Sequence, residues 1–318
     1  MIARTNAEAL IPEQTSKQII EDTVTSSVAL RLGVRMPNMT TKQLKIPVMT
    51  GSVNASFVSA DIGLKPTSGM TWDRVYVTAE ELAVIVPIPE AVLDDSDYDI
   101  WGEVRPRIVE AFASTIDKAV LHGTGKPDSW PDGLIPAAIA AGKSLETTGD
   151  LYQDINGENG ILAMIEEAGI SVDTYVGALQ LRARLRGAVD ASAQPIFRAA
   201  YSNGSAGKMT YELNGSPVIF PDNGSIDGTK ALLLAGNWNY MRYAIRQDIT
   251  YKFLDQATLS DANGRIVLNL AQQDCVALRA VMRLGWALPR PVNMVSGLDY
   301  FPFSVLTPPG SGSDAGNS

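Results

Sequence analysis

The chain has 318 residues, of which 45% are hydrophobic, so it is long and apolar enough to bury a sizeable globular core. Its 26 Lys and Arg against 35 Asp and Glu give a net charge of −9, which argues against a surface that grips nucleic-acid phosphates tightly. The single cysteine, Cys275, excludes an internal disulfide and a multi-cysteine metal site. No signal-peptide core and no run of about 20 apolar residues is present, so neither export nor a membrane span is predicted.

The N-terminal segment is predicted to be a docking arm. Residues 5–32 have an extended start followed by a short helix, and Gly33 ends that helix. Residues 43–48 alternate between polar and apolar side chains, which predicts a strand. Pro37 lies before this stretch and Pro47 near its end. The apolar positions that would share one face of the helix are Ile19, Ile20, Val24, Val28 and Leu32.

Residues 50–73 form the most unusual connection in the chain. They are rich in Gly, Ser and Thr and are flanked by strand-like runs, which predicts a long β-hairpin with a flexible tip. A loop of this length without its own core is uncommon in a compact domain and is usually functional. Because the stretch is too polar to bury itself, we expect it to reach a neighbouring subunit. The candidate contact residues are Gly51, Asp61, Gly63, Lys65, Pro66 and Gly69.

One long helix follows a strand predicted at residues 75–88. Ser96, Asp97 and Asp99 supply oxygens that can cap its N-terminus, and Gly123 and Gly125 end it. Pro106 would interrupt a regular helix. Either the helix starts near Arg105, or an irregular first segment from Asp97 to Val104 bends into it, and we favour the second. The apolar stripe that predicts burial against a sheet is Val104, Ile108, Phe112, Ile116 and Val120.

The middle of the chain predicts a separate α/β lobe. Helices are expected at residues 155–168 and 179–189 and strands at 174–179, 211–220 and 231–234. The small and polar residues 191–207 are predicted to be a loop.

The last third of the chain alternates over residues 249–259 and 265–288, which indicates long strands with an interruption near Gln272. We predict that this stretch pairs with residues 75–88 in one sheet under the long helix. The lobe at residues 136–244 is then an insertion, and residues 307–318 are a disordered tail.

No motif predicts catalysis, a metal or a cofactor. His122 lies in the last turn of the long helix, where an imidazolium would meet the negative end of the helix dipole, so its predicted role is structural. Residues 123–126 lack the first glycine of a phosphate loop. The spacing of Asp95, Asp97 and Asp99 starts like a calcium loop but lacks its glycine and its final glutamate. Cys275 is expected to be a sheet residue.

Several stretches resemble the major capsid proteins of tailed phages, with the Johnson or Hong Kong 97-like fold. They are IPEAVLDDSDYDI, a long helix ending AVLHGTG, PDGLI, LNGSPVIF, AGNWNYM and VALRAVMRLGWAL, in that order. The resemblance covers nearly the whole chain. It implies an α+β subunit with an N-terminal arm, an extended β-hairpin loop, a peripheral domain with a long spine helix and sheet, and an inserted axial α/β domain.

That resemblance divides the chain into an arm (1–44), an extended loop (45–78), a peripheral domain in two parts (79–135 and 249–306), an axial domain (136–248) and a tail (307–318). It implies a structural subunit, not an enzyme, that assembles as homo-pentamers and homo-hexamers into an icosahedral shell around double-stranded DNA. The resemblance also implies that the protein is located in the virion capsid, after synthesis and assembly in the host cytoplasm. The axial contacts expected from the rim loops are Asn203, Gly204, Asn223 and Gly224.

The same resemblance implies partners. A scaffolding protein is expected to be separate or removed, because the arm begins almost at Met1, and portal and decoration proteins are further candidates. Contact with packaged DNA would be weak and non-specific. Some members of the family cross-link their shells through a lysine of the loop, and Lys65 could supply it. Residues 274–282 contain neither the asparagine nor the glutamate that such a bond needs, so no cross-link is expected unless Asp274 acts as the base and Asn269 as the acceptor. An encapsulin-type compartment and an α/β enzyme with an unrecognised site are the alternative functions.

Overall fold

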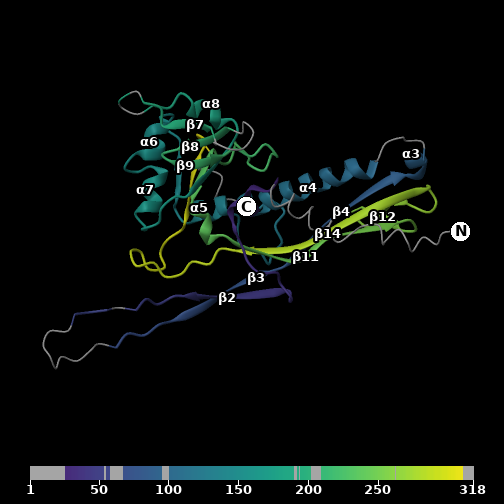
Figure 1. The fold of residues 1–318 in the computed structure, drawn as a ribbon, viewed down its shortest axis with the longest axis horizontal. Coiled ribbons are helices and arrows are strands. Elements are labelled where there is room, and N and C mark those ends of the chain that lie inside the picture. Colours follow the sequence, from purple (N-terminus) through teal and green to yellow (C-terminus); the bar gives the residue numbers. More distant parts are fainter. Residues whose placement is uncertain are drawn as a thin grey trace.

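The computed structural model describes residues 26–53, 55–57, 67–94, 100–189, 192, 194–201, 209–261 and 263–310. Figure 1 shows a long flat part, a second lobe beside one end of it, and a hairpin that projects away from both. No described helix is both long enough and apolar enough to cross a membrane.

A four-stranded sheet forms the flat part. Its central strands are long because their side chains alternate over more than ten residues, which keeps one face apolar throughout. β14 pairs antiparallel with β4 on one side and with β11 on the other, and the β11 pairing is irregular between Ile245 and Thr250. In order across the sheet, the strands are β1 (Val34–Arg35), β11 (Arg242–Leu254), β14 (Cys275–Ala287) and β4 (Glu80–Pro89).

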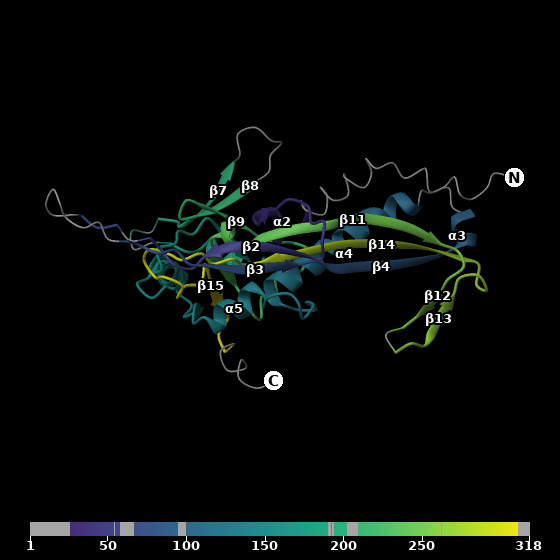
Figure 2. The ribbon, with the colours of Figure 1, turned by 90° about the horizontal axis from the view of Figure 1, so that it is seen from below.

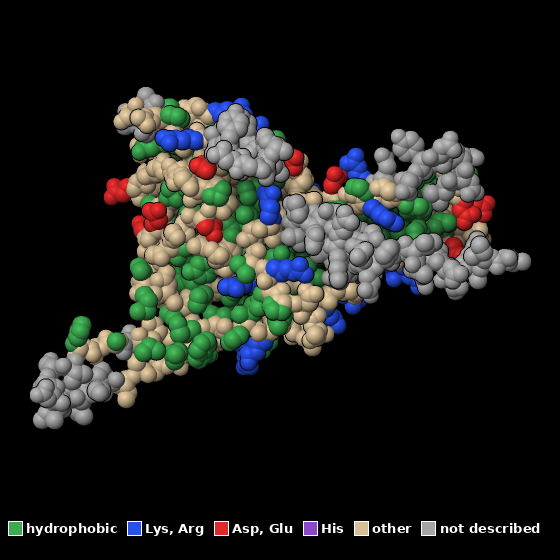
Figure 3. Space-filling model, viewed as in Figure 1, with side chains coloured by type: hydrophobic (Ala, Val, Ile, Leu, Met, Phe, Trp, Pro, Cys, Tyr) green, Lys and Arg blue, Asp and Glu red, His purple; other side chains and the backbone are tan. Residues whose placement is uncertain are grey.

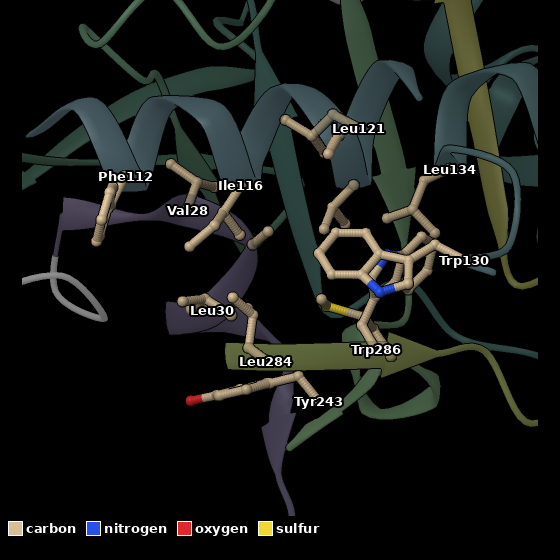
Figure 4. Packing of buried hydrophobic residues seen from close by; sticks show 14 of the residues in the cluster. Val28, Leu30, Phe112, Ile116, Leu121, Trp130, Leu134, Tyr243, Leu284 and Trp286 are labelled. Carbon is tan, nitrogen blue, oxygen red and sulfur yellow. The ribbon is translucent and has the colours of Figure 1, made fainter. Parts of the chain in front are cut away.

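The long helix α4 (Ile100–His122) covers the apolar face of this sheet (Figure 2). Of the predicted stripe, Val104 is partly buried and the other four residues are almost fully buried. Figure 4 shows Phe112 and Ile116 pointing from α4 toward Val28 and Leu30, with Leu284 of β14 beyond them. The short helix α2 (Val28–Leu32) therefore shares one core with α4 and the sheet.

Both predictions for the start of this helix are wrong. The helix is already regular from Ile100 and runs through Pro106, so it neither begins near Arg105 nor has an irregular segment up to Val104. Pro106 is exposed, so the N–H that proline lacks would lie on the solvent side of the helix, and the buried stripe stays intact. The predicted caps Ser96, Asp97 and Asp99 lie outside the described residues.

The hairpin pairs β2 (Gln43–Met49) with β3 (Trp72–Thr78) in a sheet of its own. The single strand predicted at residues 75–88 is therefore wrong, because the chain changes sheets at Ala79. Gly285 of β14 explains why the chain can change sheets at this position. A Cβ on that residue would collide with the carbonyl oxygen of Thr78, so only glycine lets the crossing backbone come this close. Trp130 Nε1 donates to the same carbonyl at 3.1 Å.

The second lobe is built on a seven-stranded sheet with a separate apolar core. In order, its strands are β5 (Ser144–Glu146), β15 (Phe303–Thr307), β10 (Leu233–Gly236), β6 (Thr174–Gly177), β9 (Ser216–Ile219), β8 (Met209–Leu213) and β7 (Phe197–Tyr201). The short helices of this part of the chain are α5 (Leu134–Ala140), α6 (Leu151–Asn156), α7 (Ile161–Glu166), α8 (Leu181–Leu185) and the 3₁₀ turn η3 (Trp238–Tyr240).

β15 corrects the prediction for the C-terminal part. Residues 303–306 were expected in the first sheet and Thr307 in a disordered tail, but β15 lies between β5 and β10 and is buried along its whole length. The chain leaves the first sheet after Ala287 because Pro289 and Pro291 cannot donate to a ladder. The second sheet thus takes a strand from beyond residues 136–244.

Smaller differences have local causes. The stretch 155–168 lies in two short helices, because the chain turns between them at Gly157 and Gly160. A Cβ at either glycine would collide with a backbone carbonyl oxygen of the preceding turn. The stretch 211–220 lies in two strands, since Asn214 and Gly215 both have positive φ and form a tight hairpin turn. The remaining elements are α3 (Glu90–Asp94), β12 (Thr258–Ser260) and β13 (Ile266–Asn269).

Two loop and strand predictions also fail for the same kind of reason. The predicted loop at 191–207 contains β7, which a hairpin partner, β8, holds in the sheet. The stretch 265–288 is interrupted at residues 270–274, as predicted, but β13 pairs with β12 in a small hairpin instead of extending the large sheet. In both cases the pairing partner, not the local pattern, decides the structure.

Candidate functional site

The hairpin carries large apolar side chains that nothing in its own subunit covers. Phe57 is fully exposed, Trp72 is 61% exposed, and Val53, Met70 and Tyr76 are about half exposed. The stretch predicted to be too polar to bury itself thus carries several large apolar residues. Their exposure indicates a surface that contacts another protein, because monomeric proteins rarely leave several large apolar groups together in water.

The apolar surface continues onto the body of the subunit. Ser52 Oγ lies 3.0 Å from Met294 Sδ, and the Val292 N–H donates to the Met49 carbonyl at 2.7 Å, so the segment before β15 lies beside the hairpin. In that segment Met294 is 79% exposed. Figure 3 shows hydrophobic side chains gathering on the body where the hairpin leaves it.

An open groove of about 650 Å³ lies at the base of the hairpin. It contains no cluster of ionisable groups that could act as acid and base. The residues that line it are mostly apolar: Met36, Ile46, Pro47, Val48, Met49, Trp72, Asn237, Asn239, Tyr240, Arg242, Pro289 and Pro291. Its lining is suited to contact with another protein surface more than to chemistry.

The structure places few of the predicted loop contacts. Gly51 and Gly69 are described, and a Cβ on Gly69 would meet nothing within 4 Å. The other four predicted contacts, Asp61, Gly63, Lys65 and Pro66, lie outside the described residues. The residues that sequence reasoning missed are the exposed apolar ones, and their signal was present in the printed sequence as Phe57, Met70 and Trp72.

Asn223 lies against the long helix. Its Nδ2 donates to Asp117 Oδ2 at 3.0 Å, and its carbonyl accepts from Ser114 Oγ at 3.2 Å. Gly224 beside it is exposed and has a positive φ, whereas Asn203 and Gly204 lie outside the described residues. Among the predicted axial residues, Asn223 therefore has an intramolecular role as well.

His122 accepts a hydrogen bond, at 3.1 Å, from the N–H of Asp227 to its Nε2. Burial lowers the pKa of His122, the Asp227 carboxylate raises it and Lys230 lowers it, with burial the largest effect. Nε2 is thus the acceptor nitrogen, and the imidazole joins the end of α4 to the loop at Asp227.

The residues that might do chemistry are scattered. Among the described residues, no group of three or more His, Cys, Asp or Glu side chains could hold a metal ion. Cys275 is buried at the start of β14, and its Sγ lies 3.2 Å from the Gln273 carbonyl. The carboxylates of Asp117 and Asp154 are buried.

The fold and this surface define a structural protein that associates with copies of itself, and comparison with known proteins gives the family. The model of the phage capsid family matches residues 7–295. The major capsid protein of Staphylococcus phage 80alpha is 25% identical over 271 residues, which is 84% of this chain and 78% of that protein.

Solved structures agree with this match. A chain from Microbacterium phage Oxtober96 superimposes with a TM-score of 0.74 at 35% identity, covering 97% of this chain and 99% of that one. A chain from Mycobacterium phage Bobi gives 0.73 at 32% identity, covering 98% and 100%.

The chain belongs to the phage capsid family. It is a major capsid protein, a structural subunit of a phage shell with the Hong Kong 97-like fold. The predicted family, fold class and shell function are confirmed.

Proposed function

We propose that copies of this subunit associate as pentamers and hexamers into an icosahedral shell around double-stranded DNA, with the hairpin of each copy packed on an adjacent subunit. The observation that carries the proposal is the exposed apolar side chains of the hairpin and of the segment beside it. Association of copies would bury these side chains. Each Å² of apolar area removed from water would stabilise the assembly by about 25 cal/mol.

The domain partition of the shell subunit follows on the same basis. Residues 45–78 form the intersubunit loop, and α4 with the four-stranded sheet forms the peripheral domain. The buried stripe of α4, from Val104 to Val120, would hold that domain rigid while the loop reaches outward. The seven-stranded lobe would face the rotation axes. Ring closure requires a different surface on each side of every subunit, which a projecting hairpin and a receiving body provide.

The net charge of −9 fits a container whose contact with packaged DNA is weak and non-specific. Synthesis and assembly would take place in the host cytoplasm. A separate scaffolding protein, a portal and decoration proteins are the further partners that such a shell would engage.

The hairpin can be tested by shortening it. Replacing residues 50–71 with Asn-Gly joins Met49 to Trp72 through a two-residue turn that suits the pairing of β2 with β3. We expect a folded subunit with the wild-type circular dichroism spectrum and no shells in electron micrographs. Shells of normal size from this variant would contradict the proposed role of the hairpin.

A milder pair of variants isolates the apolar contact. Phe57→Ser should raise the subunit concentration needed for assembly at least tenfold, while Phe57→Leu, which keeps an apolar side chain, should stay close to wild type. Light scattering against concentration measures both. Small shells without DNA from the wild-type chain would instead favour a protein compartment, and a monomer that turns over a substrate would favour an enzyme.

A further inference from the structure

Asp117 is a buried carboxylate at which three distant parts of the chain meet. It lies on α4 with no exposed surface. The arm residues before and within α2 contact it from one side, and the loop at residues 222–228 contacts it from the other. No Lys, Arg or His in the described part of the chain forms an ion pair with it.

The arm supplies three of its four hydrogen bonds. Ser27 Oγ donates to Oδ1 at 2.6 Å, and the Ala29 N–H donates to the same oxygen at 3.0 Å. The Val28 N–H donates to Oδ2 at 3.0 Å. These are groups at the N-terminus of α2, which lack partners within their own helix, so α4 supplies the acceptor that they need.

The loop supplies the fourth. Asn223 Nδ2 shares Oδ2 with the Val28 N–H, and Asn223 Oδ1 accepts from the Ser225 N–H at 3.1 Å, which fixes the amide orientation. A carboxylate has about four acceptor sites, so each one is used. An asparagine in place of Asp117 would turn an NH₂ group toward a donor of the arm or of the loop.

We propose that Asp117 couples the docking of the arm to the docking of the loop. When α2 covers Asp117, water is excluded and the bond to Asn223 is strengthened, since hydrogen bonds gain strength at low local dielectric. When α2 leaves, the carboxylate is hydrated and holds Asn223 less well. By thermodynamic linkage, loss of the loop contact weakens arm docking by the same factor.

Coupling of this kind gives the position of the arm an effect on the second lobe. It requires no contact between the arm and that lobe, because both bind the same side chain of the long helix. Burial raises the pKa of Asp117, and the hydrogen bonds from Ser27, Ala29, Asn223 and Val28 lower it, so those bonds offset part of the desolvation penalty of the charge.

Hydrogen exchange on the full chain tests the coupling. Ser27→Ala should reduce protection of the Ser225 and Asp227 amides about fivefold or more, although Ser27 touches neither. Asn223→Ala should reduce protection of the Val28 and Ala29 amides by a similar factor. Unchanged protection at the distant segment in both variants would overturn the proposal.

Ser114→Ala is the matched control, because the Ser114 hydroxyl contacts the Asn223 carbonyl without involving Asp117. It should remove one contact of the loop while the bond from Asn223 to Asp117 stays in place, so the arm amides should keep wild-type protection. Loss of arm protection in this variant, equal to that in Asn223→Ala, would show general loosening and would also overturn the role of Asp117. In an Asp117→Asn background, the cross-effects of the first two variants should vanish. If that variant does not fold, non-additivity of Ser27→Ala with Asn223→Ala in the wild-type background decides the question.

Discussion

The long helix with its sheet and the hairpin use the same kinds of side chain for opposite purposes. Phe112 on α4 is almost fully buried between the arm and β14, whereas Phe57 on the hairpin is fully exposed. Both are phenylalanines with the same hydrophobic driving force. In one case the subunit itself buries the ring, and in the other the ring is exposed, where we propose that a neighbouring subunit covers it.

The difference separates folding from assembly. Substitutions in the buried region change the free energy of unfolding of one subunit, because each core residue loses contacts within the chain. Substitutions of the exposed hairpin residues are expected to leave that free energy nearly unchanged and, if the proposed contact forms, to weaken association. A shell protein benefits from this separation, since each copy can fold before it meets its neighbours.

The largest expected effect comes from applying the same substitution in both regions. Phe112→Ala should lower the free energy of unfolding of the unassembled subunit by about 3 to 5 kcal/mol, through lost burial and the cavity left behind. Phe57→Ala should change it by less than about 0.5 kcal/mol, as for other surface sites. Chemical denaturation followed by tryptophan fluorescence measures both. Equal losses would mean that the comparison between the two regions is mistaken.

Glycine substitutions sharpen the comparison at the backbone. Gly285→Ala would bring a methyl group against the Thr78 carbonyl, where the chain crosses from the hairpin to the large sheet. Because backbone cannot move aside cheaply, we expect a loss of about 1 to 3 kcal/mol. Gly69→Ala has open space around it and should be neutral in the subunit. Melting temperatures of the two purified variants provide the test; a neutral Gly285→Ala would contradict the close crossing.

His122 predicts a smaller, pH-dependent effect at the end of α4. Burial lowers its pKa from the ordinary 6.5, so the unfolded chain binds a proton before the folded one does as the pH falls. The stabilising contribution is complete above about pH 6.5 and declines below it. His122→Gln keeps an acceptor for the Asp227 N–H without titrating. Its melting temperature should therefore fall less than that of the wild type between pH 7.5 and 5, and identical profiles would rule out this role.

The last prediction is that no covalent cross-link forms between subunits. Residues 274–282 lack the asparagine and glutamate that a lysine cross-link needs, so Lys65 is not expected to form one. Shells boiled in detergent should run as one band near 34.1 kDa. A ladder that survives reduction would show that the hairpin forms a bond and not only an apolar contact.

Much of the fold could be predicted from the sequence where one local pattern is long enough. The stripe from Val104 to Val120 recurs at five positions with helical spacing, and only a half-buried helix satisfies it. The long alternation in β14 is equally restrictive. The order of such segments, together with short stretches such as LNGSPVIF and AGNWNYM, carried the resemblance to the family. The Asn214-Gly215 turn was also readable as a hairpin signal but was passed over.

Tertiary structure alone decided which sheet each short strand joins. Nothing local to Phe303–Thr307 distinguishes a strand of the first sheet from one of the second, and its place between β5 and β10 depends on partners far along the chain. The same holds for the crossing at Gly285. It holds also for Asp117, which looks like an ordinary charge within an amphipathic helix. Its meeting with Ser27 and Asn223, about 90 and 106 positions away in sequence, exists only after folding, because hydrogen bonds between distant residues leave no periodic pattern in the chain.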